Sequence, residues 1–167
     1  MKNVKDDQMS GRKPSESTVT MTEIVLPSHA NSLGTIFGGT IMSWIDIAAA
    51  IAAQKHSRSI VVTASIDALH FIAPVKVGHV VHIKASVNFA GRTSMEVGAR
   101  VESENPLTGE RAHTASAYTT FVALDKSGKP QSVPTVAPDT ADEKRRFRAA
   151  QERRKSRMDL AARLRRP

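Results

Sequence analysis

Polar and hydrophobic residues alternate along much of the chain, and one long stretch near its start is almost uniformly apolar. Residues 80–89 and 95–101 place apolar side chains at every second position, with polar side chains between them. The runs with strand composition are residues 18–26, 60–71, 80–89, 95–101 and 111–124, and turn residues follow at 73–78, 91–92 and 105–109. Period-two runs joined by short turns predict an antiparallel sheet with one covered face.

The apolar stretch predicts the only helix available to cover that sheet. Residues Thr40 to Lys55 have helix composition, and nearly every position between Ile41 and Ala53 is apolar. A helix that is apolar on all sides is buried on all sides. The pattern therefore predicts an α+β domain in which a curved antiparallel sheet wraps one long central helix. Helix faces that the strands leave open are expected to meet a partner subunit.

Asp46 is the one charged residue between Gly39 and Lys55. Burying a lone carboxylate costs several kcal/mol unless it is paired or neutralised. One interpretation is a catalytic base in an apolar site. The other is a carboxylate that faces a crevice or accepts hydrogen bonds from a neighbouring chain.

The segment before this helix, Asn31 to Gly39, carries the paired glycines Gly38 and Gly39. Glycines at a helix start let a ligand approach the backbone closely, and the free N–H groups there can bind an oxyanion or a phosphate. On its own the pair is a weak signal, and a plain turn explains it better.

The net charge of +8 is concentrated at the carboxyl end. Residues 141–167 hold 11 Lys/Arg and 4 Asp/Glu, whereas the other 140 residues hold 13 basic and 12 acidic side chains. This segment is rich in Ala, Arg, Glu and Leu, so it is predicted to be a helix. We expect it to be solvated or to cover a subunit surface. Binding of ligand phosphates is an alternative, while no interleaved aromatic residues favour nucleic acid.

Length and composition predict one globular domain of 18–137, preceded by a flexible segment of 1–17 and followed by the basic helix of 138–167. The absence of cysteine excludes disulfides and a thiolate nucleophile, and is compatible with a cytoplasmic location. Residues 1–14 are not a signal peptide, and no apolar run reaches the roughly 18 residues of a membrane span. The six histidines form no HxxxH or HxxE pair, so no metal site is expected.

Several motifs are matched together by one known family. They are Leu26-Pro27, Asn31, Gly34, Ile36-Phe37-Gly38-Gly39, Met42, Ile45-Asp46, the run 62–67, Phe71, Pro74-Val75, Val77-Gly78, the run 93–96 and the run 142–147. With these residues, over about 18–148, the chain resembles the cytosolic acyl-CoA thioester hydrolases of the hotdog superfamily. The pattern departs from the family at His29 and Thr35, where relatives often carry an acidic or amide side chain, which leaves the acyl-chain preference open.

The resemblance implies hydrolysis of acyl-CoA to a free carboxylic (fatty) acid and coenzyme A, without a cofactor or metal. It implies that Asp46 is the general base or the nucleophile, and that Asn31 of a partner subunit positions water or substrate. The backbone N–H groups of Gly38 and Gly39 would polarise the thioester carbonyl. A hotdog dehydratase acting on 3-hydroxyacyl thioesters, with His29 as its only loop histidine, and a non-catalytic binding module are the alternatives.

The resemblance also implies a homo-oligomer, at least a dimer and in this branch a trimer of dimers, which is a homo-hexamer. We expect no nucleic-acid or membrane partner. The residues expected to bind coenzyme A are Thr63, Ala64, Ser65, Arg92, Thr93 and Ser94, with arginines 145, 146 and 148 as further candidates for its phosphates. The acyl tunnel is expected to be walled by Phe37, Met42 and Trp44.

Overall fold

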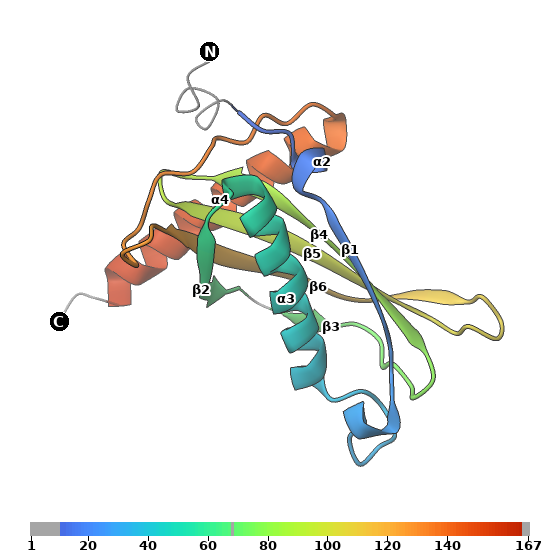
Figure 1. Ribbon diagram of the computed structural model, residues 1–167. Coiled ribbons are helices and arrows are strands. Elements are labelled where there is room, and N and C mark those ends of the chain that lie inside the picture. Colours follow the sequence, from blue (N-terminus) through green and yellow to red (C-terminus); the bar gives the residue numbers. More distant parts are fainter. Residues whose placement is uncertain (1–10, 68, 165–167) are drawn as a thin grey trace.

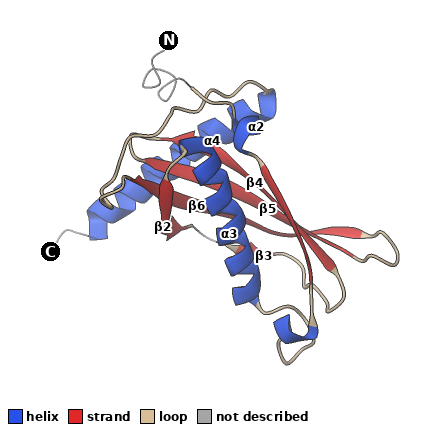
Figure 2. Cartoon of the chain, in the orientation of Figure 1, coloured by secondary structure: helices blue, strands red, loops and turns tan. Residues whose placement is uncertain are grey.

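The computed structural model describes residues 11–67 and 69–164, which form one curved antiparallel sheet with a long helix on each of its two faces (Figure 1). The colouring by secondary structure distinguishes the two long helices from the strands of the sheet (Figure 2). In chain order the elements are α2 (Pro14–Ser17), β1 (Val19–Ile24), η1 (Pro27–His29), α3 (Gly38–Ser57), β2 (Ile60–Ile66), β3 (His70–Phe71), β4 (Val80–Ala90), β5 (Ser94–Glu104), β6 (Arg111–Leu124) and α4 (Ala141–Leu164). The predicted α+β hotdog architecture, with its central helix and additional C-terminal helix, is confirmed.

The sheet has the strand order β1-β4-β5-β6-β2, and the short strand β3 also pairs with β6. All pairs are antiparallel. Strands β1 and β2 lie at the two edges, so β2, which follows α3 in the chain, has one unpaired side among the described residues. The run 60–71, predicted as one strand, is divided into β2 and β3.

Helix α3 crosses the concave face of the sheet and supplies one side of the hydrophobic core. Its buried side chains include Ile41, Ile45, Ala49 and Ala53, which pack against inward-facing residues of the strands. Within the single protomer the strands cover only one side of α3, and the cover of its other side by a partner subunit stays a prediction. The outer side of α3 exposes a stripe of large apolar residues, namely Met42, Ile47 and Ile51.

Helix α4 packs against the convex face of the sheet (Figure 1). The sheet is therefore covered on both faces, whereas the alternation of residues predicted only one covered face. Its start is a capping box, since the Thr140 hydroxyl accepts the Glu143 N–H at 3.2 Å and the Glu143 carboxylate accepts the Thr140 N–H at 3.0 Å. Farther along, Arg153 and Arg157 form ion pairs with Glu96 of β5, whose side chain is 1% exposed. The basic segment is therefore tied to the sheet of its own chain.

The amino-terminal segment also differs from its prediction. Residues 1–10 of the predicted flexible segment lie outside the described residues, but residues 11–17 include α2, an isolated bridge between Arg12 and Val136, and the buried Ser17. This corrects the expected flexibility for 11–17. Among the helices of the described ranges, none has the length and apolar character needed to cross a membrane.

Candidate active site

Asp46 lies in the middle of α3, on the side that faces the edge strand β2. Its Oδ1 atom accepts a 2.8 Å hydrogen bond from the Thr63 hydroxyl of β2. The carboxylate is half-buried, and its second oxygen, Oδ2, has no hydrogen-bond partner within the described residues. One oxygen is thus held in place while the other can accept a proton or attack an electrophile. Sequence reasoning placed Thr63 with coenzyme A and missed this contact, which only the packing of β2 on α3 creates.

A β-bulge in β2 determines which way Thr63 points. The register of β2 with β6 shifts between Thr63 and Ser65, so Ala64 is the extra residue. In a regular strand, residues two apart share a face. Here Thr63, paired with the core residue Phe121, points to α3, whereas Ser65, paired with Thr120, lines a cavity beneath α4. Because of the bulge, the Thr63 hydroxyl points to Asp46 and the Ser65 hydroxyl points to the opposite face of the sheet.

Asn31 closes the loop before α3. Its Oδ1 accepts the N–H groups of Leu33 at 2.9 Å and Thr35 at 3.3 Å, and its Nδ2 donates to the Thr35 hydroxyl at 3.0 Å. The turn needs Gly34, whose φ of 73° is in the left-handed region. Because an amide nitrogen has two N–H groups, Asn31 keeps one donor for a water or a carbonyl.

The N–H groups of Gly38 and Gly39 lie at the start of α3 and have no backbone or side-chain acceptor in the part of the chain that the structure describes. A Cβ at Gly39 would lie 2.7 Å from the Phe37 ring, so the exposed Phe37 side chain would have to move to make room for it. Asp46 follows Gly38 by eight positions, which is about 12 Å along a helix axis. Within one protomer the carboxylate and these N–H groups are therefore too far apart to act on the same carbonyl.

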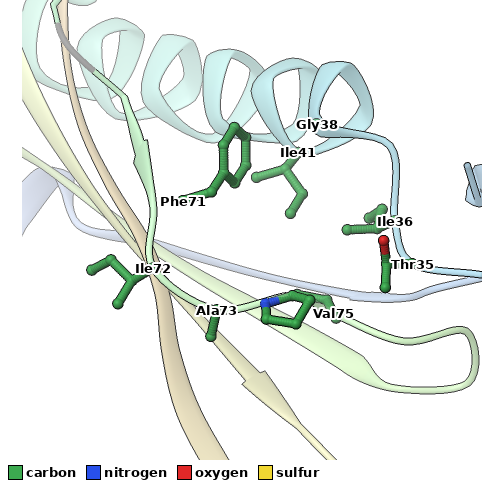
Figure 3. Close-up of a pocket in the computed structure, with 9 residues that line it drawn as sticks. Thr35, Ile36, Gly38, Ile41, Phe71, Ile72, Ala73 and Val75 are labelled. Atoms are coloured by element: carbon green, nitrogen blue, oxygen red, sulfur yellow. The ribbon is translucent and has the colours of Figure 1, made fainter. Parts of the chain in front are cut away.

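An apolar cavity of about 300 Å³ opens beside the start of α3 (Figure 3). It is formed by the loop before α3, the first turn of α3 and the segment from β3 to Val75, and its lining includes Ile36, Gly38, Ile41, Phe71 and Pro74. The Phe71 ring and the Ile41 side chain lie close together on its α3 side. None of Phe37, Met42 and Trp44, the predicted tunnel walls, is among the residues that line it.

The residues predicted to bind coenzyme A are not gathered at one place. Thr63 contacts Asp46, while Ser65 and Ser94 line a second cavity of about 400 Å³ together with Arg154 and Arg157 of α4. Arg92 is exposed at the turn between β4 and β5, where the Arg92 carbonyl accepts the Val133 N–H and the Thr93 carbonyl accepts the Ala123 N–H of β6. Arg154 was not predicted, because only the fold of α4 onto the sheet brings it to this turn.

The two remaining candidates for a reactive group are a catalytic histidine, as in a dehydratase, and a metal site. His29 Nδ1 accepts the Leu26 N–H at 3.2 Å, and its ring packs edge-on against Trp44 at 5.2 Å, so the histidine is part of the loop's own structure. Within residues 11–67 and 69–164, no three His, Cys, Asp or Glu side chains are grouped to hold a metal ion. The groups that can act on a substrate are a held carboxylate, an amide donor and two helix-terminal N–H groups.

Comparison with known proteins identifies the family. Residues 33–110 match the family model of the thioesterase superfamily. Over 128 residues the chain is 44% identical to YkhA of Bacillus subtilis, an uncharacterized acyl-CoA thioester hydrolase, covering 77% of this chain and 74% of that protein. The chain belongs to the acyl-CoA thioester hydrolases of the hotdog superfamily. It is also 41% identical to acyl-coenzyme A thioesterase 11 of Mus musculus, over 92% of this chain, but spans only 26% of that longer protein.

Solved structures of this hydrolase family agree with the fold. An apo-hexameric acyl-CoA thioesterase superposes with a TM-score of 0.89 at 45% identity, over 92% of this chain and 99% of that one. The acyl-CoA hydrolase of Staphylococcus aureus, solved with butyryl coenzyme A, coenzyme A and coenzyme A disulfide, superposes with a TM-score of 0.84 at 39% identity, over 92% and 95% of the two chains. Variants of the staphylococcal enzyme with alanine in place of an aspartate, a threonine or an asparagine are also known.

Proposed function

We propose that this chain hydrolyses acyl-CoA thioesters in the cytoplasm, so that acyl-CoA and water give a free fatty (carboxylic) acid and coenzyme A. The observation that carries the proposal is the hydrogen bond from Thr63 to Asp46 Oδ1, which leaves Oδ2 open. As a general base, Oδ2 takes a proton from a water whose oxygen attacks the thioester carbon. As a nucleophile, Oδ2 attacks directly, and water then cleaves the resulting anhydride. In both routes the sulfur leaves as the thiolate of coenzyme A.

The staphylococcal relative supports the choice of residues. The asparagine, aspartate and threonine that were replaced in it follow one another at intervals of 15 and 17 residues. Asn31, Asp46 and Thr63 follow one another at the same intervals. We therefore assign to Thr63 the role of orienting the carboxylate, and to Asn31 that of positioning water or substrate.

The site is proposed to form between two protomers. Gly38 and Gly39 lie about 12 Å along α3 from Asp46 of the same chain, whereas substrate polarisation and attack must occur at one carbonyl. We propose that a dimer covering the exposed apolar stripe of α3 brings the Asn31–Gly39 loop of one protomer to Asp46 and Thr63 of its partner. The hexameric relative supports further assembly into a trimer of dimers.

The cavity beside Gly38 is suited to the acyl group. Its lining is largely apolar and includes Gly38, whose N–H group would hold the carbonyl oxygen. The edge strand β2, with exposed backbone from Thr63 to Ser65, can hydrogen-bond the amides of the pantetheine arm. The names of the relatives favour hydrolysis over the dehydratase and binding-module alternatives.

The first test measures thiol release from a panel of acyl-CoAs. Asp46→Asn keeps the shape of the side chain and its bond to Thr63 but removes the basic oxygen, so we expect a fall in kcat of at least about a hundredfold. Asp159→Asn, on the exposed side of α4, is the matched control and should keep full activity. Full activity of Asp46→Asn would contradict the mechanism. Single-turnover hydrolysis in oxygen-18 water tests direct attack, because water that cleaves the anhydride at the Asp46 carboxyl carbon leaves an unlabelled Asp46 oxygen in the first acid product, whereas the general-base route puts a water oxygen there.

The second test asks whether the site is shared. Asp46→Ala and Asn31→Ala are each expected to be nearly inactive. After the two variants are unfolded together and refolded at equal amounts, half of the dimers are mixed, and each mixed dimer has one intact site. About a quarter of wild-type activity should then return. No recovery, with mixed dimers shown by mass spectrometry, would place both residues in the site of one protomer.

A further inference from the structure

The convex face of the sheet holds a third cavity, with a polar lining, on the other side of the sheet from Asp46. It has a volume of about 400 Å³ and lies between strands β4, β5 and β6 and the first turns of α4. Four cationic side chains line it, Lys84, Arg100, Arg145 and Arg146, and Asn88 and Tyr118 add polar groups. No carboxylate is among its lining residues. Such a lining is built of hydrogen-bond donors and positive charge.

The strand register explains how this hollow arises. Lys84 lies opposite Arg100, and on the next rung of the same face Gly98 lies between Ser86 and Tyr118. With no side chain at Gly98, the sheet has a gap at this position, and a Cβ there would lie 2.5 Å from Asn88 Nδ2. The glycine thus makes room for the Asn88 amide at the base of the cavity.

Asn88 is itself held in an unusual position. The register of β4 with β5 shifts between Val87 and Phe89, so Asn88 is the extra residue of a β-bulge. Its side chain is buried, with 3% exposure, yet Nδ2 has no hydrogen-bond partner in the described structure. A buried amide nitrogen without an acceptor costs about 1–3 kcal/mol. An acceptor bound in the cavity would remove that cost.

The charges in the cavity are only partly neutralised within the protein. Arg100 pairs with Glu102, and Arg145 pairs with Asp142 in an exposed contact. Lys84 and Arg146 form no ion pair with any described residue, and the buried Nε of Arg146 has no partner there either. Two free cations beside an unsatisfied amide donor are a site for an anion with several acceptor oxygens.

We propose that this cavity binds a phosphoryl group, held by Lys84, Arg146 and the Asn88 amide, at a site separate from the proposed catalytic residues. A phosphate offers three or more acceptor oxygens and a formal charge that matches two cations. The cavity is large enough to hold a diphosphate. The phosphoryl group belongs either to a free nucleotide or pyrophosphate, or to the nucleotide end of coenzyme A. The binding itself does not depend on the proposed hydrolysis.

The direct test is calorimetric titration of the full chain with pyrophosphate and with ADP. Lys84→Gln/Arg146→Gln should weaken binding by about a hundredfold, because each of the two lost contacts to a charged group is worth about one factor of ten. The matched control, Lys144→Gln/Lys155→Gln, removes the same charge from exposed positions of α4 that do not line the cavity. It should bind as the wild type does. Equal weakening in both double variants, or no binding by the wild type, would overturn the proposal.

A second variant tests the amide. Asn88→Asp has nearly the same shape but places an acceptor, and a negative charge, where the donor was. It should abolish pyrophosphate binding while circular dichroism and the oligomeric state remain those of the wild type. If it binds pyrophosphate normally, Asn88 does not face the ligand and the proposed site is wrong.

Steady-state kinetics identifies the source of the phosphoryl group. If it belongs to coenzyme A, Lys84→Gln/Arg146→Gln raises KM for acyl-CoA but leaves KM for the matching acyl-pantetheine, which lacks the nucleotide, unchanged. If it belongs to a free ligand, both KM values stay the same, and pyrophosphate still binds to protein saturated with coenzyme A. Either result is consistent with a phosphoryl site once the titration has shown binding.

Discussion

The Thr63 hydroxyl donates a 2.8 Å hydrogen bond to Asp46 Oδ1 and so connects the edge strand β2 to the middle of helix α3. Asp46 is the only acid in that helix between its start and Lys55, and Thr63 is the group that fixes its orientation. A carboxylate that must meet a substrate carbonyl gains from such support, because misplacement of about 1 Å costs much of the rate.

Removal of the Thr63 hydroxyl should lower the rate more than substrate affinity. Thr63→Val keeps the volume of the side chain but loses the donor, and a hydrogen bond to a charged group is worth about 1.5–3 kcal/mol. We expect kcat to fall about ten- to a hundredfold, with little change in KM. Thr63→Ser should restore most of the activity. Equal kcat for the Val and wild-type proteins in a thiol-release assay would show that Thr63 has no part in the reaction.

The exposed side of α3 should control assembly. Ile47 is 48% exposed in the protomer, and Ile47→Lys would place a charge within the proposed dimer contact. We expect light scattering to show a shift to monomers and the activity to fall with it. Leu107→Lys is the control, because Leu107 is 93% exposed at the tip of the turn between β5 and β6. A monomer with full activity would contradict the shared site.

The ion pairs of Glu96 should matter for the attachment of α4. Glu96 is almost fully buried and accepts hydrogen bonds from both Arg153 and Arg157. Glu96→Gln leaves Arg153 without its counter-charge and leaves Arg157 with Asp67 alone. We expect a loss of about 2 kcal/mol or more in the free energy of unfolding, measured with urea. Glu152→Gln, an exposed change on α4, should be neutral within about 0.5 kcal/mol.

His56 should make stability depend on pH. Burial, opposed by the hydrogen bond to the Pro134 carbonyl, lowers the pKa of His56 below its ordinary 6.5. The folded protein then binds the proton less tightly than the unfolded chain does. The contribution to stability is complete above about pH 6.5 and is lost as the pH falls toward the folded pKa. In His56→Gln, urea unfolding between pH 7 and 5 should show a weaker loss of stability than in the wild type. Parallel profiles for the two proteins would contradict this assignment.

The elements could be predicted from the sequence where one face of each is apolar. The alternation from Val80 onward gave β4 and β5, and the composition of 40–55 gave most of α3, because burial of one face fixes the period. The exposed stripe at Met42, Ile47 and Ile51 could not be separated from the core, since hydropathy is the same for a side chain that meets a strand and one left for a partner.

Because of the two β-bulges, the period-two alternation of the sequence could not predict which face of the sheet the residues at the candidate sites occupy. Phe89 was expected to share a face with Val87, but the bulge at Asn88 turns it outward, where it contacts Phe147 of α4 with ring centroids 5.4 Å apart. A single extra residue is invisible to a period-two count unless the partner strand is known. For the same reason Thr63 and Ser65 were assigned to one ligand although they face opposite sides of the sheet.

Deletion of Ala64 would remove the bulge of β2 and reverse the faces of the residues beside it. In the wild-type protein, Ser65 and Asp67 lie on the α4 side of the sheet, where Asp67 pairs with Arg157 at 2.5 Å. With one residue fewer, either the Asp46 carboxylate loses its hydroxyl donor or α4 loses the Asp67 contact. The length of a seven-residue edge strand thus couples the chemistry on the concave side to the docking of the basic helix on the convex side.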